Sequence, residues 1–200
     1  MPINDIFSTT LCIFEMRIVI TGGASNGKST IVNELAMILG FPKIDESARP
    51  LIAYLQEIEM WPLDSNAKPS TQQLMLLEKM IIQDELKKEL TLPQSYVRDR
   101  TGLDSKGHSI FYGAPLPQEF EEYVKLLKID RVYAPDPIPF AKDGIRYENP
   151  EEALAIHNLI CEVYEDHGFP VTKVPKFSDN KEDSIKQRIE FILKDLQHGK

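Results

Sequence analysis

Residues 22–29 are the part of the chain whose residue types and spacing best suit chemistry. They read Gly-Gly-Ala-Ser-Asn-Gly-Lys-Ser and fit the pattern G-x-x-x-x-G-K-[ST]. In such a loop the backbone N–H groups surround phosphate oxygens, and the glycines permit the dihedral angles and the close approach that this requires. Lys28 would place a positive charge beside the β- and γ-phosphates, and the Ser29 hydroxyl would bind Mg²⁺. The sequence therefore predicts a site for a nucleotide polyphosphate.

The position of this loop supports the same interpretation. It follows a β-branched stretch at residues 17–21 and precedes apolar residues at helical spacing over residues 29–39. The positive end of a helix dipole would then face the phosphates. The alternative, a glycine-rich turn with a surface lysine, does not account for this position. The candidate nucleotide contacts are Gly22, Gly23, Ala24, Ser25, Asn26, Gly27, Lys28, Ser29 and Thr30.

A second acidic position ends the short stretch at residues 95–99. In proteins with a phosphate loop, an acid at a strand end beside the loop holds Mg²⁺, usually through water. Asp99 is the candidate for this role, together with Ser29. The alternative is that Asp99 caps the segment that follows it.

Residues 45–49, Asp-Glu-Ser-Ala-Arg, follow another short strand candidate. A carboxylate at such a strand end can face the γ-phosphate, where it can accept a hydroxyl proton or bind metal. Arg49 can bind a phosphate or a carboxylate with two N–H groups. A structural role fits the pattern equally well: Asp45 or Ser47 would cap the following helix, and Arg49 would be exposed.

Residues 135–150 hold four prolines and one glycine and fit no regular element. We expect a lid-like loop there. Its charges Lys142 and Arg146 could close onto a phosphoryl group that is being transferred. Solvated charge on a loop is the alternative, and the spacing by itself favours it.

The remaining pattern alternates short apolar stretches with longer helical ones, which predicts a βαβ architecture with a mainly parallel sheet. Residues 61–70 and 102–117 read as connections without regular structure. Strands are expected at residues 17–21, 41–45, 95–99, 130–134 and 170–174, and helices at residues 29–39, 50–59, 71–90, 119–127, 151–167 and 180–196.

Composition limits the class of protein. Two hundred residues suit one domain, and 42% hydrophobic with 27% charged residues is a globular balance. A net charge of −8 disfavours nonspecific nucleic-acid binding, which needs a basic surface. The sequence has no apolar run of about 18 residues, so it predicts no membrane span. We expect a leader at residues 1–15, which lack a basic n-region, and one domain at residues 16–200.

The cysteines and histidines show no metal-ligand spacing. Cys12 and Cys161 lie far apart and are expected to be reduced thiols in a cytoplasmic protein. No site role is predicted for the four histidines, which are His108, His157, His167 and His198.

Several motifs together resemble the nucleoside and nucleotide kinase branch of the phosphate-loop NTPases. More narrowly, the chain is similar to the small AAA-domain ATPase-like family, which is related to the ribosylnicotinamide kinase domain of the bacterial NAD regulator. The resemblance covers nearly all of residues 16–196. It is carried by residues 20–23 (Ile-Thr-Gly-Gly), 27–30 (Gly-Lys-Ser-Thr), 46–49 (Glu-Ser-Ala-Arg), Asp99-Arg100 with Asp104, 143–146 (Asp-Gly-Ile-Arg), 164–168 and 174–175.

This resemblance implies an α/β fold with three α/β/α layers and five parallel strands in the order 2-3-1-4-5. It implies ATP, or less often GTP, with Mg²⁺. It favours Glu46 as a general base, Arg100 as a residue near phosphate, and Arg146 as a lid arginine. Glu46, Arg49 and Asp104 become the candidate substrate-binding residues.

The nucleotide base would rest near Phe177, after the last strand. An aromatic wall for the substrate could come from Tyr54, Trp61, Phe111 or Tyr112. Related kinases are often homodimers, and the sequence leaves the oligomeric state open.

The expected function is an ATP- and Mg²⁺-dependent phosphotransferase that acts on a small metabolite of the nucleoside or nucleotide kind. The candidate catalytic residues are Lys28, Glu46, Arg100 and Arg146. The alternative is an ATP- or GTP-binding switch, or an ATPase, without a small-molecule acceptor.

Overall fold

The sheet has five parallel strands, in the order that the sequence resemblance implies. The computed structural model describes residues 15–24, 26–64, 67–138 and 148–198. The strands lie in the order β2-β3-β1-β4-β5, and the two central pairings of β1 are with β3 and β4. Their bounds are Arg17–Ile20 for β1, Lys43–Ile44 for β2, Tyr96–Asp99 for β3, Arg131–Pro135 for β4 and Val171–Val174 for β5.

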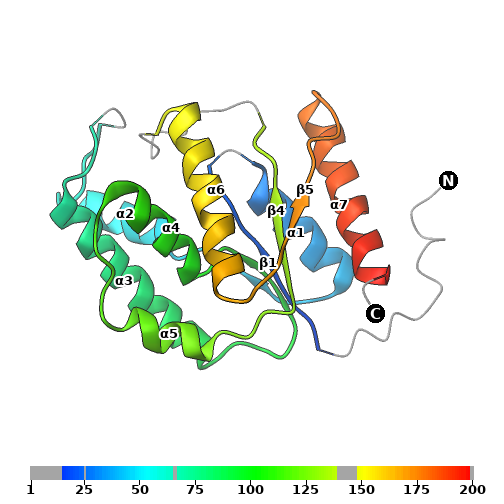
Figure 1. Ribbon diagram of the computed structural model, residues 1–200, viewed down its shortest axis with the longest axis horizontal. Coiled ribbons are helices and arrows are strands. Elements are labelled where there is room, and N and C mark those ends of the chain that lie inside the picture. Colours follow the sequence, from blue (N-terminus) through cyan, green and yellow to red (C-terminus); the bar gives the residue numbers. More distant parts are fainter. Residues whose placement is uncertain (1–14, 25, 65–66, 139–147, 199–200) are drawn as a thin grey trace.

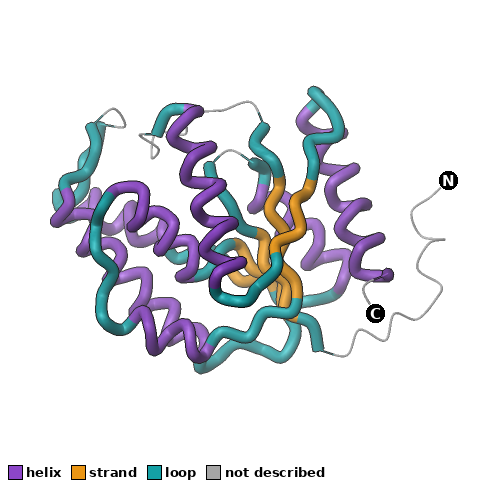
Figure 2. The backbone as a smooth tube through the Cα atoms, in the orientation of Figure 1, coloured by secondary structure: helices purple, strands orange, loops and turns teal. Residues whose placement is uncertain are grey.

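Helices cover both faces of the sheet, so that the predicted three-layer α/β/α fold is confirmed (Figure 1). One face packs against α1 and α7, and the other packs against α3, α4, α5 and α6. Figure 2 shows the strands enclosed between these two groups of helices. The bounds are Lys28–Leu39 for α1, Ala48–Glu57 for α2, Thr71–Glu89 for α3, Gly102–Tyr112 for α4, Phe120–Leu126 for α5, Pro150–Asp166 for α6 and Lys181–His198 for α7.

The central strand β1 shows why this sequence makes a covered sheet. Successive side chains of a strand point to opposite faces. Ile18 and Ile20 pack into the cluster with α1 and α7, while Val19 packs into the opposite cluster. All three side chains are fully buried, as expected for a parallel sheet that is buried on both faces.

Residues 102–117, predicted to be irregular, contain helix α4, so this prediction is wrong. The apolar periodicity that marks the other helices is weak here, because Gly102 and Gly107 and several polar residues interrupt it. The helix begins instead with a capping box. The Thr101 backbone N–H donates to Asp104 Oδ2, and the Thr101 hydroxyl oxygen accepts from backbone N–H groups of the first turn. The spacing T-x-x-D was the signal that could have revealed this helix.

The other predicted elements lie within two residues of their observed bounds. Helix α2 begins at Ala48 rather than at Pro50, because a proline in the first turn lacks only an N–H that would have no partner within the helix. The predicted loop at residues 135–150 is shorter at both ends, because β4 ends at Pro135 and α6 begins at Pro150. Its middle, residues 139–147, and most of the predicted leader, residues 1–14, lie outside the described residues.

None of the helices in the described ranges is both long enough and apolar enough to cross a lipid bilayer.

Helix α4 packs against α6 through Gly107, and this contact gives a testable prediction. A Cβ atom at this position would lie 2.5 Å from Ile160 Cγ1 and 3.0 Å from Ile160 Cα. Glycine-to-alanine changes within helices usually stabilise by about 1 kcal/mol. Here we expect Gly107→Ala to destabilise by about 1–3 kcal/mol, because the backbone of α6 must move. Urea unfolding measures this difference.

The matched control is Ile110→Ala on the same helix, where the side chain is 53% exposed. We expect the control to change the free energy of unfolding by at most about 0.5 kcal/mol. A Gly107→Ala variant as stable as the parent protein would contradict the close approach of α4 to α6.

Candidate active site

The predicted site residues meet at one edge of the sheet. Strands β1, β2 and β3 are parallel neighbours, so their carboxyl ends lie on the same side. The phosphate loop follows β1, Glu46 follows β2, and Asp99 and Arg100 end β3. Tertiary structure thus gathers three segments that are about 20 to 75 residues apart in the chain.

The loop needs glycine at its first two positions. Gly22 has a φ of +110°, which L side chains rarely adopt, and a Cβ there would lie 2.5 Å from His157 Nδ1. A Cβ on Gly23 would lie 2.5 Å from the backbone oxygen of Ala153. Helix α6 therefore packs directly against the phosphate loop.

His157 on α6 holds the loop, a role that the sequence did not predict. The backbone N–H of Gly23 donates a hydrogen bond of 3.2 Å to His157 Nδ1. Burial, together with the nearby Lys28 charge, lowers the pKa of His157 to about 4. The ring is therefore neutral at pH 7, and Nδ1 is free to accept. A lone histidine carries no spacing signal, so only the fold reveals this contact.

We expect His157→Leu to raise the KM for the nucleotide about tenfold, because the Gly23 N–H would lose its partner and the loop would lose one anchor. Steady-state kinetics measures this change. Cys161→Ala is the control, because this side chain contacts the far side of the His157 ring at 3.8 Å and lies one turn further along α6. An unchanged KM in His157→Leu would show that the contact does not position the loop.

The far end of the loop is held by α7. Arg188, which is fully buried, donates hydrogen bonds to the backbone oxygens of Asn26 at 2.9 Å and Asp136 at 2.8 Å. The Asn26 side chain donates to the Pro135 oxygen at 3.1 Å. The described part of the loop is thus held by the end of β4 and by α7 as well as by α6.

Lys28 is buried within this loop. Its Nζ atom donates to the Gly23 oxygen at 2.6 Å and to Asn26 Oδ1 at 2.8 Å. Burial and the Arg100 charge lower the pKa of Lys28 to about 7. The residue before it, Gly27, is the N-cap of α1 and has no side chain to bond the first N–H groups of the helix. An anion fits this place, because it would restore the lysine charge and satisfy those N–H groups.

The candidate magnesium residues lie in contact. The Ser29 hydroxyl donates a hydrogen bond of 2.6 Å to Asp99 Oδ2. Asp99 Oδ1 is buried and has no hydrogen-bond partner among the described residues. Burial raises the pKa of Asp99, against the opposing effect of Lys28. A hydroxyl and a carboxylate oxygen with spare capacity fit Mg²⁺, which prefers oxygen ligands.

No group of three or more His, Cys, Asp or Glu side chains suits a metal ion within the described ranges.

Glu46 lies between two arginines. Its carboxylate is 2.6 Å from Arg49 Nε and 3.2 Å from Arg100 Nε. Burial raises the pKa of Glu46, but Arg100, Lys28 and Arg49 outweigh it and hold the pKa below its usual value. Glu46 is therefore ionised at neutral pH and can accept a proton.

The alternative role for this segment, capping of the following helix by Asp45 or Ser47, is wrong. The Ser47 hydroxyl bonds Asp84 of α3 at 2.7 Å instead of the first turn of α2. Asp45 is exposed and pairs with Lys43 at 2.8 Å. Arg49 is half exposed, as that alternative expected, but it is paired with Glu46.

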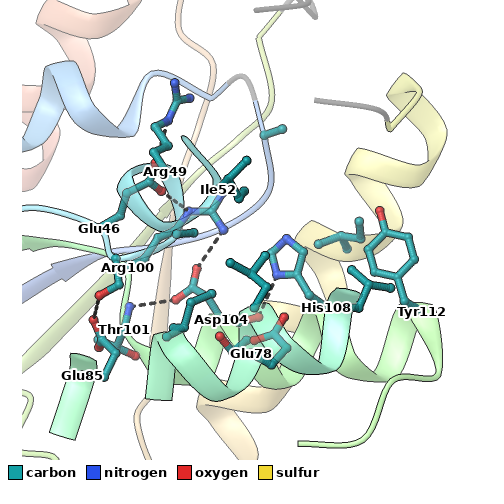
Figure 3. A pocket seen from close by; sticks show the side chains of 18 of the residues that line it. Glu46, Arg49, Ile52, Glu78, Glu85, Arg100, Thr101, Asp104, His108 and Tyr112 are labelled. Atoms are coloured by element: carbon teal, nitrogen blue, oxygen red, sulfur yellow. Dashed lines mark hydrogen bonds and ion pairs between the residues drawn. The ribbon is translucent and has the colours of Figure 1, made fainter. Parts of the chain in front are cut away.

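Arg100 lies at the centre of the charged groups, as Figure 3 shows. Its backbone φ of +66° is left-handed, a conformation that costs a non-glycine residue about 1–3 kcal/mol. Its side chain pairs with Glu46 and, at 3.6 Å, with Asp104. Burial lowers the pKa of Arg100, but the carboxylates of Asp104, Glu46 and Asp99 outweigh burial and raise this pKa above its usual value. The guanidinium therefore stays charged.

Asp104 is fixed from several sides. It accepts hydrogen bonds from the Thr21 hydroxyl at 2.8 Å and the Tyr164 hydroxyl at 2.7 Å, and from the Thr101 N–H at 3.1 Å. These contacts hold the carboxylate that positions Arg100. Asp104 was predicted to bind substrate, and it does line the pocket described next.

A pocket extends from the phosphate loop toward α3. Ala24 of the loop, Glu46 and Arg100 all line it. Of the four aromatic residues considered for a substrate wall, Trp61 and Tyr112 line the pocket. The other apolar wall residues include Ile52, Leu74, Leu77 and Ile81.

Two further predicted residues, Thr30 and Phe177, are exposed. Thr30 is exposed in the first turn of α1. Phe177 follows β5, is 42% exposed, and packs against Phe191 with ring centroids 5.8 Å apart. Ser25 and Arg146 lie outside the described residues, as does Lys142.

The chain matches one known protein family over most of its length. The family described as "AAA domain" matches residues 17–182. The chain belongs to this AAA-domain family. No curated protein sequence matches the AAA-domain chain.

Solved structures share the fold of this AAA-domain chain. Deoxyadenosine kinase from M. mycoides, with dCMP and dCDP bound, is 18% identical with a TM-score of 0.64 and covers 92% of this chain and 100% of its own. Thymidylate kinase from Ehrlichia chaffeensis is 14% identical with a TM-score of 0.61 and covers 90% and 98%. The NadR protein in complex with NR is 18% identical with a TM-score of 0.60 and covers 90% of this chain and 50% of its own.

Proposed function

We propose that this AAA-domain chain is an ATP- and Mg²⁺-dependent phosphotransferase whose acceptor is a small metabolite of the nucleoside or nucleotide class. One observation carries the proposal: Glu46 and Arg100, which pair at 3.2 Å, line the same apolar-walled pocket as Ala24 of the phosphate loop. A nucleotide-binding switch needs no such pocket. The kinases with the same fold support this choice.

The nucleotide side of the site would work through the loop. Its N–H groups and Lys28 bind the β- and γ-phosphates. Ser29 and Asp99 hold Mg²⁺, which when bound neutralises charge on the phosphate oxygens. The nucleotide base would rest near Phe177. The family resemblance favours ATP, and GTP stays the alternative donor, because residues 180–183, Asn-Lys-Glu-Asp, match the guanine pattern N-K-x-D.

The acceptor side would work through Glu46. Its ionised carboxylate takes the proton of the acceptor hydroxyl as the oxygen attacks the γ-phosphorus, while the bond from the γ-phosphorus to the β,γ-bridging oxygen breaks and ADP leaves. Arg49, Arg100 and the predicted lid residue Arg146 offset the charge on the transferring group. The pairing of Glu46 with both Arg49 and Arg100 keeps this carboxylate ionised between the two substrates.

A phosphoryl-transfer screen tests the proposal. The purified chain is incubated with ATP, Mg²⁺ and a panel of nucleosides, mononucleotides, ribosylnicotinamide and vitamins, and mass spectrometry records the products. We expect one class of acceptor to gain a single phosphoryl group. ADP release that no acceptor changes would overturn the proposal in favour of an ATPase or a nucleotide-dependent switch.

A further inference from the structure

Glu78 is a charged residue in an apolar position. It lies in the middle of α3, near Leu74, Leu77 and Ile81, and only 5% of its surface is exposed. Burial of a carboxylate is costly unless hydrogen bonds or charges compensate it. The reason for an acid at this position must therefore lie in its surroundings.

Only part of this carboxyl group is satisfied by the protein. Ser105 of α4 hydrogen-bonds the Glu78 side chain. The other oxygen, Oε2, is buried and has no hydrogen-bond partner among the described residues. Buried polar atoms in folded proteins nearly always have a partner. An atom of this kind that lines a pocket points to a ligand.

Glu78 belongs to the pocket that the proposed acceptor would occupy. It lines the same cavity as Arg100 and Ala24, but from the side of α3 (Figure 3). Trp61, Tyr112 and the aliphatic wall residues give the cavity an aromatic and apolar lining, which suits a planar ring. Arg100, the nearby cation in this lining, pairs with Glu46 and Asp104 rather than with Glu78.

We propose that Glu78 is the residue that recognises the acceptor, and that its Oε2 atom accepts an N–H from an amino or amide group on a planar ring. This inference rests on the proposed function, since it assigns the depth of the same pocket to the ring of the acceptor. It restricts the acceptor to ring compounds that carry an N–H donor.

Recognition of this kind depends on pH. Burial raises the pKa of Glu78 to about 7, although Ser105 and Arg100 act in the opposite direction. The ionised form accepts the N–H, so acceptor affinity rises as the pH rises through 7. The other charged or titratable groups that line the pocket are Glu46, Arg49, Glu85, Arg100, Asp104, His108, Tyr112 and Glu148.

Two of the neighbouring groups bear on this pH range. Burial and the Arg100 charge hold the pKa of His108 below its usual value, so His108 is already neutral above pH 7. Lys28, outside the pocket, has a pKa of about 7. Acceptor binding is therefore measured without nucleotide, and Glu78 variants separate the titration of Glu78 from the titration of Lys28.

The test is titration calorimetry with matched ligand pairs that differ only in the amino or amide group. The pairs are adenosine and purine riboside, cytidine and pyrimidin-2-one riboside, and ribosylnicotinamide and ribosylpyridinium. We expect the parent chain to prefer one amino or amide compound over its partner by about 10- to 100-fold at pH 8. Glu78→Leu should abolish that preference.

Proton release gives a second readout that a purely structural carboxyl would not affect. At pH 7 the parent chain should release roughly half a proton on binding, as shown by titrations in buffers of different ionisation enthalpy. Glu78→Gln keeps an acceptor oxygen but does not titrate, so its affinity should be independent of pH between 6 and 8. Glu57→Gln, on the exposed surface of α2, is the control.

Folding of the variants is checked by thermal unfolding. Because the pKa of Glu78 is raised in the folded state, the parent chain loses stability as the pH rises from about 4.5 through 7. Glu78→Gln avoids this loss, so it should unfold at a higher temperature than the parent chain at pH 8.

The outcomes are distinct. An equal preference in Glu78→Leu and the parent chain, or no binding by any pair, overturns the inference. Preferential binding without phosphorylation of any acceptor would overturn the proposed function and leave the recognition by Glu78 intact.

Discussion

Lys28→Ala should lose phosphoryl transfer by about a thousandfold or more and still fold. The lysine is the positive charge that the loop offers to the β- and γ-phosphates, and a charge that stabilises the transferring group is commonly worth this much. Its contacts in the ligand-free chain, the Gly23 oxygen and Asn26 Oδ1, both lie within the loop. Product formation by mass spectrometry and thermal unfolding measure the two parts of this prediction.

The fold should tolerate this change because Lys28 does not stabilise it. Burial lowers the pKa of Lys28 to about 7, so the folded state holds this proton less tightly than the unfolded state. The charged form therefore reduces stability most at pH values below 7, and stability recovers as the pH rises from about 7 to 10.5. At pH 6, Lys28→Ala should unfold at the same temperature as the parent chain or at a higher one.

The control is Lys125→Ala on the exposed surface of α5, which should leave both transfer and stability unchanged. Full activity in Lys28→Ala would end the phosphotransferase proposal. An unfolded Lys28→Ala variant would contradict the local nature of the lysine contacts.

Glu46→Gln should lower kcat about 100- to 1,000-fold, because the amide cannot accept the proton of the acceptor. The KM for ATP should change little, since the loop and Lys28 bind that substrate. Glutamine keeps the shape of the side chain and one acceptor oxygen, which can keep the contact with Arg49 or the contact with Arg100 but not both, because the two arginines contact different oxygens of Glu46. Steady-state kinetics with the acceptor found in the screen gives both constants.

The pH profile supplies a further check on Glu46. Its pKa lies below the usual value, so in the parent chain the loss of this base occurs only on the acid side of about pH 4.5. Glu57→Gln is the matched control. Unchanged turnover in Glu46→Gln would favour an ATPase or a switch over a kinase.

The sequence located the loop well because its chemistry is local. The glycines, Lys28 and Ser29 must be contiguous to surround a phosphate, and the structure explains two of the glycines by a positive φ and by contact with α6. Glu46 and Arg100 were predicted partly through resemblance, and the fold brings them to 3.2 Å from each other. The order of the strands also came from resemblance, because periodicity does not specify which strands are neighbours.

The interior charges were not predictable in the same way. Arg98 in β3 is fully buried and pairs with Glu85 and, at 2.5 Å, with Glu89 of α3. On α3 these acids read as polar positions of an amphipathic helix. Only the packing of α3 beside β3 turns them into partners of a buried arginine.

By itself, the sequence determined the βαβ alternation, the phosphate loop and the acids that follow the strands, because each depends on neighbours within about ten residues. Tertiary structure alone decided that His157 and Arg188 hold the loop from two helices, and that α4 forms at residues 102–112. It also placed Glu78 in the lining of the same pocket as Glu46 and Arg100. The physical reason is that burial, pKa and hydrogen-bond partners depend on which distant segments the fold brings together.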